Sequence, residues 1–376
     1  MGHQASKPNQ RTGILICGSY GLGNTGDESI LDAILREVRA VAGDEELTVL
    51  SRNPDETAAL HGVKALHMFD FSGILKAMGR ARLYINGGGS LIQDATSRRS
   101  LWYYLFTLYA AKRRGCKVLM YGCGIGPVTR FGDVSLVRRV LNGCVDAITL
   151  REDSSLEELK RFGVDRPEIV LAADPVLSLR PAAGGEIDAL MARLGLDPGG
   201  AYLGVCLRDW KGFENKAPVI AGALRYAREE YGLTPVFLSV NHIDDGDAAD
   251  RVAAHLGGGA SCIVRDPLST GLMLGLTSRM QAMISMRLHG LVFAAGQGVP
   301  LVGVIYDPKI SGFLSYMGQE LCQELDRLSS ESLRGMLDRA LALRADRESL
   351  CAAVDGLRRL EQNNSDTLRR LLEGTP

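Results

Sequence analysis

Short apolar runs alternate with longer amphipathic segments along almost the whole chain, and this alternation constrains the fold more than any other feature. It is typical of parallel strands joined by helices that cover the sheet. In the first half, the runs predict strands at residues 13–17, 47–50, 82–85, 117–121 and 147–150. In the second half, they predict strands at residues 202–207, 235–240, 261–264, 280–285 and 301–305. The sequence therefore predicts a doubly wound α/β fold.

Two domains are expected, because 376 residues exceed the usual size of a single hydrophobic core. Prolines and glycines accumulate over residues 172–186, where helical spacing lapses, so we place a linker there. We expect the N-terminal domain to cover residues 13–176, the C-terminal domain residues 177–345, and a helical tail residues 346–376. Residues 1–12 lack the apolar core of a signal peptide and are interpreted as a disordered leader.

Charge and cysteine content exclude several classes of protein. The net charge of −1 and the pI near 6.6 give no basic field, so no nucleic-acid partner is expected. The eight cysteines form no C-x-x-C pair and several lie in apolar runs, which is typical of free thiols in a reducing compartment. The longest apolar stretch, residues 101–111, is far shorter than the ~20 residues that span a bilayer. We therefore expect a cytoplasmic protein.

The same stretch carries five aromatic residues, namely Trp102, Tyr103, Tyr104, Phe106 and Tyr109. Such a cluster is compatible with contact to a lipid-linked ligand or a membrane interface. A helix buried in the core is the stronger expectation.

Three glycine-rich segments follow predicted strands, at residues 18–26, 86–89 and 122–126. Residues 21–26 match the dinucleotide pattern G-x-G-x-x-G, but the second strand ends in Ser51-Arg52-Asn53, without the acidic residue that holds a ribose. Arg52 leaves a 2′-phosphate, and hence NADP, as a minor alternative. We expect the glycines either to let a ligand approach the backbone or to turn the chain tightly. Side chains beside these loops that are candidates for binding hydroxyl groups are Asp27, Gln93 and Asp94, with helix capping an equal alternative for the two carboxylates.

Arg287 and His289 follow the strand predicted at residues 280–285, and Lys309 follows the next strand along the chain. The carboxyl ends of parallel strands share one sheet edge, where open α/β sheets bind ligands, so these three residues should lie there together. Two cations and a titratable imidazole suit a small, multiply charged anion. We expect His289 to act in proton transfer rather than as a structural residue.

Two further arginines end predicted strands. Arg151 follows the strand at residues 147–150, which we take as the last strand of the first domain, and should point toward the cleft between the domains. The alternative is a surface ion pair with Glu152 or Asp153. Arg208 ends the first strand of the second domain in the same way, with ligand contact and simple solvation equally expected. The remaining histidines form no ligand motif, so no metal site is predicted.

In chain order these segments resemble the polysaccharide pyruvyltransferase family, particularly the bacterial type that modifies secondary cell-wall polymers for surface-layer anchoring. The segments that carry the resemblance are GSYGLGNTGDESIL, NGGGSLIQDATSRRSLWYYL, YGCGIGP, ITLREDSS, AADPV and MRLHGLVFAAGQGVPLVGVIYDPK. They extend from Gly13 to about Leu321. The resemblance implies two Rossmann-like domains that face a cleft in a GT-B-like glycosyltransferase architecture. It also implies phosphoenolpyruvate as the donor substrate, with no cofactor.

The resemblance further implies a donor pocket formed by Arg151, Arg287, Leu288, His289 and Lys309, with Arg151, Arg287 and His289 as catalytic residues. Within it, His289 would transfer a proton while Arg287 and Lys309 hold the phosphate. Arg151 would hold the carboxylate or the phosphate. Acceptor contacts are expected at Asn24, Asp27, Gln93, Asp94 and Asp174. The base for the acceptor hydroxyls stays open among Asp27, Asp94 and Asp174.

By analogy, the acceptor is a β-linked N-acetylmannosamine of a lipid-linked precursor, which would give a 4,6-ketal and bring the enzyme to the inner face of the membrane. The chain departs from the family pattern at residues 239–242, Ser-Val-Asn-His, where relatives carry a glutamine-containing segment. Two alternatives remain. One is a nucleotide-sugar-dependent GT-B glycosyltransferase, and the other is a noncatalytic sugar-phosphate-binding protein.

Overall fold

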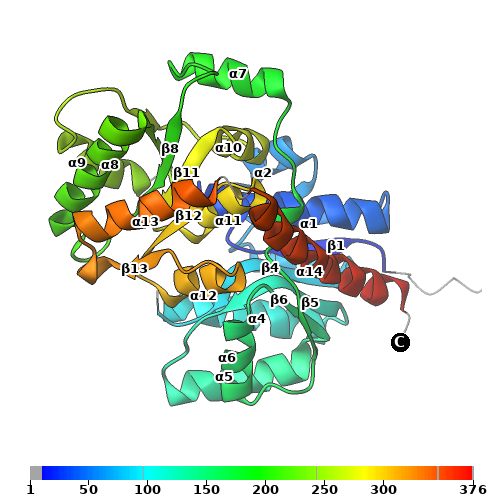
Figure 1. Cartoon of the computed structure of the whole chain (residues 1–376). Helices are drawn as coiled ribbons and strands as arrows, with labels where there is room; N and C mark the ends of the chain where they lie inside the picture. Colours follow the sequence, from blue (N-terminus) through cyan, green and yellow to red (C-terminus); the bar gives the residue numbers. More distant parts are fainter. Residues whose placement is uncertain (1–10, 96, 243, 345–346, 375–376) are drawn as a thin grey trace, which may run out of the picture. The chain divides into compact units, whose positions relative to one another are not determined.

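The computed structural model describes residues 11–95, 97–242, 244–344 and 347–374. Of the expected leader, residues 1–12, the first ten lie outside the described residues. Strands and helices alternate throughout, and they build two separate parallel sheets (Figure 1). The predicted α/β class with two Rossmann-like halves is confirmed.

The first sheet has seven strands in the order β3-β2-β1-β4-β5-β6-β7, all parallel. Its strands are β1 Ile14–Cys17, β2 Leu47–Ser51, β3 Lys64–His67, β4 Leu83–Ile92, β5 Lys117–Ile125, β6 Ala147–Leu150 and β7 Glu168–Leu171. The helices between them are α1 Thr25–Ala42, α2 Pro54–His61, α3 Phe71–Arg80, α4 Arg98–Arg113, α5 Phe131–Cys144 and α6 Asp153–Phe162. Apolar side chains from α3, α4, α5 and α6 form one core with one face of this sheet.

The second sheet has six parallel strands in the order β10-β9-β8-β11-β12-β13. Its strands are β8 Tyr202–Cys206, β9 Thr234–Leu238, β10 Cys262–Val264, β11 Met280–Ser285, β12 Leu301–Ile305 and β13 Cys322–Glu324. The α-helices from the linker onward are α7 Gly184–Arg193, α8 Ala217–Tyr231, α9 Asp245–Ala254, α10 Thr270–Thr277, α11 Leu288–Gly296, α12 Pro308–Tyr316, α13 Ser330–Leu343 and α14 Arg347–Glu373. Helices α8, α9 and α13 cover one face of this sheet.

Local sequence signals explain where several helices begin and end. Proline stands in the first turn of α2, α8 and α12, where its missing N–H costs no hydrogen bond. Gly62, Gly163 and Gly232 end α2, α6 and α8 with a positive φ, which closes the last turn without the steric cost of a Cβ. Each helix therefore stops close to the start of the following strand.

Three strands were not expected from the sequence: β3, β7 and β13. All three lie at sheet edges, and their side chains are half-buried or exposed rather than buried. An edge strand has one neighbour and little burial, so it lacks the continuous apolar run that identified the inner strands. The strand before Arg151 is consequently not the last of its sheet, because β7 pairs beside it.

The chain divides into two compact units that do not follow simple sequence order. Among the described residues, unit 1 contains residues 11–22, 30–175 and 361–374, and unit 2 contains residues 23–29 and 176–360. Helix α1 therefore begins in unit 2 and continues in unit 1, and α14 does the same near the end of the chain. The sequence pattern places residues 23–29 with the N-terminal half and residues 346–376 in a separate tail.

The last turns of α14 are fastened to unit 1 by polar contacts. Asn363 Nδ2 donates to Leu171 O at 2.8 Å, and Asn364 Nδ2 donates to Ala173 O at 3.0 Å. Glu361, in the same helix, is 4% exposed. Burial raises the pKa of Glu361 to about 8, and the neighbouring Glu37 carboxylate adds to the shift.

Candidate active site

The carboxyl edge of the sheet in unit 2 gathers most of the polar residues predicted to bind ligand. The strand order changes direction between β8 and β11, which makes this position the topological switch point of the sheet. Arg208 follows β8 closely, and Arg287 and His289 follow β11. Open parallel sheets form crevices at such points, so the geometry favours a ligand site here.

Arg287 is buried and fixed by Asp245, the first residue of α9. Its Nε donates to both carboxylate oxygens of Asp245, at 2.9 Å and 3.2 Å, and its Nη2 also contacts Oδ1. The same carboxylate accepts from the backbone N–H groups of Val240, at 3.0 Å, and Asn241, at 2.9 Å. Burial raises the pKa of Asp245, and the Arg287 guanidinium opposes that shift. Nε and Nη2 contact Asp245, so the guanidinium has a fixed orientation. Nη1 takes no part in this ion pair and is oriented to bind a ligand.

Sequence reasoning missed Asp245 because its importance depends on a partner 42 residues away. The available signal was its position shortly after β9, at the same sheet edge. The turn before Arg287 is fixed by Ser285, whose hydroxyl donates to Arg287 O at 2.6 Å and accepts from Arg287 N at 3.0 Å. The motif at residues 285–290 is thus a strand-to-helix turn that presents an arginine with one orientation.

His289 lies in the first turn of α11 and is 9% exposed. Its ring packs against Gly26, so closely that a Cβ at position 26 would overlap Nδ1 of the imidazole. Phe293, one turn along α11, lies 6.1 Å from the imidazole, centroid to centroid. Glycine at position 26 is therefore required by a close approach to His289, and not by a positive φ.

The segment that carries Gly26 is joined to unit 2 by its backbone. Thr25 N donates to Val240 O at 2.7 Å, and His242 N donates to Gly23 O at 3.2 Å, so the segment pairs like a short strand with the chain after β9. Thr25 Oγ1 also lies 3.0 Å from His242 Nε2. Burial lowers the pKa of His242, which favours a neutral imidazole. His242 is a second residue that sequence reasoning did not assign to the site.

Lys309 and its neighbour Asp307 occupy the start of α12. Asp307 Oδ1 accepts from Lys309 N at 3.1 Å and so caps the helix, while Oδ2 lies 3.3 Å from Lys309 Nζ. Both side chains are about one-third exposed. An ion pair this exposed contributes little stability, so an anionic ligand could draw Lys309 away at small cost.

Arg208, Trp210 and Tyr306 form a cluster at the same edge. Arg208 Nη1 donates to Tyr306 Oη at 2.8 Å, and its guanidinium lies 5.0 Å from the Trp210 ring and 5.1 Å from the Tyr306 ring. Because β8 and β12 flank β11, this contact spans the end of the strand that carries Arg287. A polar pocket of about 720 Å³ adjoins the cluster, with Arg208, Trp210 and Arg251 among its lining residues.

Arg151 lies in unit 1 and is buried, with its guanidinium fully engaged by neighbours. Its Nε donates to Glu152 and its Nη1 to Asp174, each at 3.0 Å, and its Nη2 donates to Ser90 Oγ at 3.3 Å. Burial alone would lower the pKa of Arg151, but the two carboxylates outweigh it and raise the pKa. The alternative of an ion pair with Glu152 names the right partner, but the Arg151 side chain is buried and not at the surface, and Asp174 is a second partner that was not expected.

Two of the three glycine-rich segments are strands rather than loops, because residues 86–89 lie within β4 and residues 122–125 within β5. A Cβ at Gly87 would overlap Tyr20 Oη, one at Gly88 would overlap Ile30, and one at Gly122 would overlap Pro175. These glycines make room for the packing of other residues on the sheet. The expectation of three ligand-facing loops at one edge is therefore corrected.

The expected acceptor contacts are divided between the units. In unit 2, Asn24 Oδ1 accepts from Gly26 N at 3.0 Å, and Asn24 Nδ2 donates to Asp27 Oδ2 at 2.8 Å. In unit 1, Asp94 Oδ2 accepts from Thr129 N at 3.0 Å. The other two candidates also lie in unit 1: Gln93 packs over Gly126, and Asp174 pairs with Arg151. Asn24 and Asp27 are the candidates closest in sequence to the glycine beneath His289.

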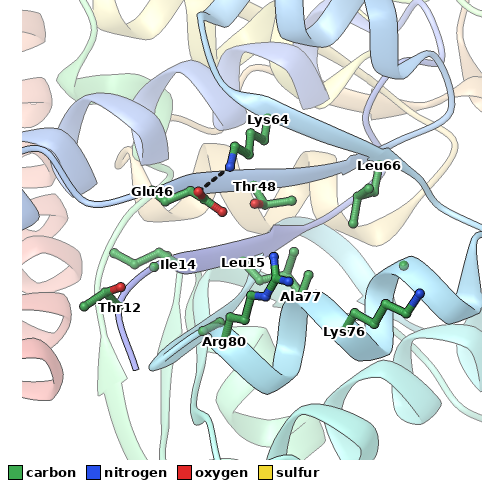
Figure 2. Close-up of a pocket in the computed structure, with 13 residues that line it drawn as sticks. Thr12, Ile14, Leu15, Glu46, Thr48, Lys64, Leu66, Lys76, Ala77 and Arg80 are labelled. Carbon is green, nitrogen blue, oxygen red and sulfur yellow. Dashed lines mark hydrogen bonds and ion pairs between the residues drawn. The ribbon is translucent and has the colours of Figure 1, made fainter. Parts of the chain in front are cut away.

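A smaller cavity, of about 190 Å³, lies at the opposite, amino edge of the sheet in unit 1. Figure 2 shows Lys64 bonded to Glu46 at the start of neighbouring strands, with Arg80 reaching from α3. Open parallel sheets bind ligands at the carboxyl edge, so this cavity is not assigned to the active site. Within the described residues, no helix is both long and apolar enough to cross a membrane.

Comparison with known proteins identifies a family and a fold. Residues 24–308 match the family model described as "Polysaccharide pyruvyl transferase". No curated protein matches the chain. The UDP-GlcNAc 2-epimerase from Neisseria meningitidis bound to UDP-GlcNAc is 9% identical with a TM-score of 0.67, over 96% of this chain and 100% of that one. A glycosyltransferase from Rickettsia africae ESF-5 is 11% identical with a TM-score of 0.65, over 97% and 100%. At such low identity the likeness shows the fold alone, and it confirms the predicted GT-B-like architecture.

Proposed function

Because the chain belongs to the polysaccharide pyruvyl transferase family, we propose that it moves the pyruvyl group of phosphoenolpyruvate onto two hydroxyl groups of a sugar. The observation that carries the proposal is the extent of the family match, which includes Gly26, Arg287 and His289. The products would be a cyclic ketal and inorganic phosphate.

The reaction needs a proton donor and cations around one small, multiply charged anion. A proton is added to the methylene carbon of phosphoenolpyruvate, and a sugar hydroxyl attacks the adjacent carbon. The C–O bond to phosphate then breaks, and a second hydroxyl takes its place and closes the ketal. The two hydroxyl protons balance the one added to carbon and the one lost with phosphate. Fixed positive charge near the phosphate stabilises its departure.

We assign the proton transfer to carbon to His289, because an imidazole titrates near neutral pH and this one stands at a strand-to-helix junction. Arg287 would bind the phosphate through Nη1, since Asp245 fixes its orientation through the other two nitrogens. Backbone N–H groups at the start of α11, beginning at Leu288, would add to the anion site. Lys309 would turn from Asp307 toward the phosphate.

Arg151 remains a proposed contact for the carboxylate or phosphate of the donor. Its two carboxylate partners, Glu152 and the buried Asp174, keep it charged, which is a requirement for that role. For the acceptor we propose Asn24 and Asp27 as hydroxyl contacts, with Asp27 as the base. The position of Asp27 next to Gly26, which packs on His289, supports this choice over Asp94 and Asp174.

For the acceptor we propose an N-acetylmannosamine residue of a lipid-linked cell-wall precursor, ketalised at its 4- and 6-hydroxyls. Such an acceptor would bring the protein to the inner face of the membrane. Surface-layer anchoring would be the role of the finished polymer.

The test incubates the full chain with phosphoenolpyruvate and a synthetic β-N-acetylmannosaminide. We expect phosphate release together with an acceptor mass gain of one pyruvate less one water. Parallel reactions omit the acceptor or replace phosphoenolpyruvate with UDP-sugars, which a glycosyltransferase would use. Transfer of a sugar from a UDP-sugar would refute the proposal. So would binding of phosphoenolpyruvate that leads to no phosphate release with any amino sugar tried.

A further inference from the structure

Helix α4 of unit 1 has a second apolar face that points away from the core. Leu101, Tyr104, Leu105 and Leu108 are buried against the sheet. The exposed residues of the helix, Arg99, Trp102, Phe106, Tyr109 and Arg113, follow one another at intervals of three and four. That spacing places them in one line along the outer side of the helix. The three aromatic side chains are 42% to 49% exposed.

Neighbouring aromatic residues extend this line into a patch. Phe71, at the start of α3, meets Phe106 edge to face at 5.7 Å, and Phe69 meets Tyr103 at 5.8 Å. Phe69 and Phe71 are themselves nearly half exposed. We call Phe69, Phe71, Trp102, Phe106 and Tyr109 the aromatic face. A cluster of exposed rings of this kind marks an interaction surface rather than the scattered apolar residues of an ordinary surface.

Positive charge stands at both ends of the exposed line of α4. Residues 71–114 contain eight lysines and arginines and one acidic residue, Asp94, in a chain whose net charge is −1. Three of these cations pair with carboxylates from other segments: Arg82 with Glu45, Arg98 with Asp133 and Lys112 with Asp146. Arg99 and Arg113 stand at the two ends of the exposed line, and the Arg98 guanidinium lies 4.3 Å from the Trp102 ring. Two carboxylates lie close by: Asp133 is buried and paired with Arg98, and Asp70 caps α3. The surface therefore combines aromatic rings with a local excess of positive charge.

We propose that the aromatic face docks unit 1 on a bilayer that contains anionic lipids. Tryptophan, tyrosine and phenylalanine would enter the boundary between headgroups and acyl chains, and the flanking arginines would meet the lipid phosphates. A second copy of the chain is a poor occupant, because a symmetric contact would place two basic surfaces against each other. The inference does not depend on the proposed reaction, since it concerns a surface on α3 and α4 and requires no substrate.

The first test measures binding of the full chain to vesicles by sedimentation. We expect binding to phosphatidylcholine vesicles that also contain phosphatidylglycerol, weakened by added salt, and much weaker binding to phosphatidylcholine alone. Equal binding to both vesicles, or binding to neither, would overturn the proposal.

The second test uses the two tryptophans of the chain. In a Trp210→Phe background, Trp102 is the remaining tryptophan and reports directly on the aromatic face. We expect its emission to move to shorter wavelength, and its quenching by iodide to fall, when anionic vesicles are added. If the protein sediments with the vesicles but the Trp102 emission does not change, another surface of the protein binds them. That result would overturn the assignment of the aromatic face.

Substitutions then locate the contact. Phe106→Gln with Tyr109→Gln should lower the partition coefficient at least tenfold, whereas Leu60→Gln, at a 66% exposed position on α2, should leave it unchanged. Arg99→Gln with Arg113→Gln should lower it by about 25-fold, at about a fivefold loss for each charge near the surface. Arg193→Gln, on exposed α7 surface of unit 2, is the matched control. Thermal unfolding of each variant checks that it is folded.

Wild-type binding in both double variants would overturn the proposal. So would a stable dimer that the Phe106 and Tyr109 substitutions dissociate, because the face would then be a protein interface. A failure of pyruvyl transfer would not affect either result, so the two proposals can fail separately.

Discussion

Replacing Glu361 by glutamine should stabilise unit 1 at neutral and alkaline pH. Glu361 is a buried residue of α14, and burial together with Glu37 raises its pKa from 4.5 to about 8. The folded protein therefore keeps this proton at pH values where the unfolded chain has lost it. The free energy of unfolding should fall as the pH rises from about 4.5 to about 8, because the folded state binds more protons than the unfolded state.

The size of the effect follows from the two pKa values. Linkage between 4.5 and about 8 makes this group cost about 1 kcal/mol of stability near pH 5, about 3 kcal/mol near pH 7 and about 5 kcal/mol near pH 9. Glutamine has nearly the same shape and no charge to bury. Glu361→Gln should therefore remove most of this pH dependence, with a gain of only about 1 kcal/mol near pH 5.

The assay is urea unfolding at about pH 5, 7 and 9, followed by Trp102 fluorescence in the Trp210→Phe background so that the signal comes from unit 1. Glu229→Gln, at an exposed position on α8, is the matched control and should not change the pH profile. If the profiles of Glu361→Gln and its parent run parallel between pH 5 and 9, Glu361 is not the buried acid that we infer.

Three further predictions concern the candidate active site. Gly26→Ala should lower kcat/KM at least tenfold, because the new Cβ would overlap the His289 ring. Gly132→Ala, at a position with open space around it, is the control and should not change kcat/KM. Equal rates for the two variants would show that the position of the His289 ring is irrelevant. Arg287→Ala should reduce the free energy of unfolding by about 3–5 kcal/mol, because it leaves Asp245 buried without its cation. Adding Asp245→Asn should restore much of that stability but no activity. An unchanged thermal midpoint for the single variant would contradict the buried pair. His289→Ala should abolish phosphate release while its thermal midpoint stays within a few degrees of wild type, and ordinary turnover would remove its assigned role.

Sequence reasoning worked best where burial is complete. The strands over residues 147–150, 280–285 and 301–305 have the bounds that their apolar runs predict, and all of them lie inside a sheet. The edge strands β3 and β7 were not predicted, because their half-exposed residues do not form a continuous apolar run. The inner strands, and with them the fold class, can thus be predicted from the pattern of apolar runs along the sequence.

The same reasoning located strand-end residues but not their partners. Arg287, His289 and Lys309 lie at the ends of β11 and β12, as the alternation predicts. The pairing of Arg287 with Asp245 is set by how α9 packs beside the sheet, and no local pattern encodes that. The aromatic helix was misjudged for a related reason: the expectation of a buried helix holds for its inner side, whereas its outer side is exposed.

The exchange of helix ends between the units limits how the protein can be taken apart. A fragment that stops near residue 175 would lack residues 361–374, whose side chains bind Leu171 O and Ala173 O. A fragment that starts there would carry His289 without Gly26 and its backbone pairing to the chain after β9. Neither half is a natural module for separate expression. A chimera that joins halves of two relatives at this linker should therefore fail to fold unless residues 23–29 are exchanged together with unit 2 and residues 361–374 together with unit 1.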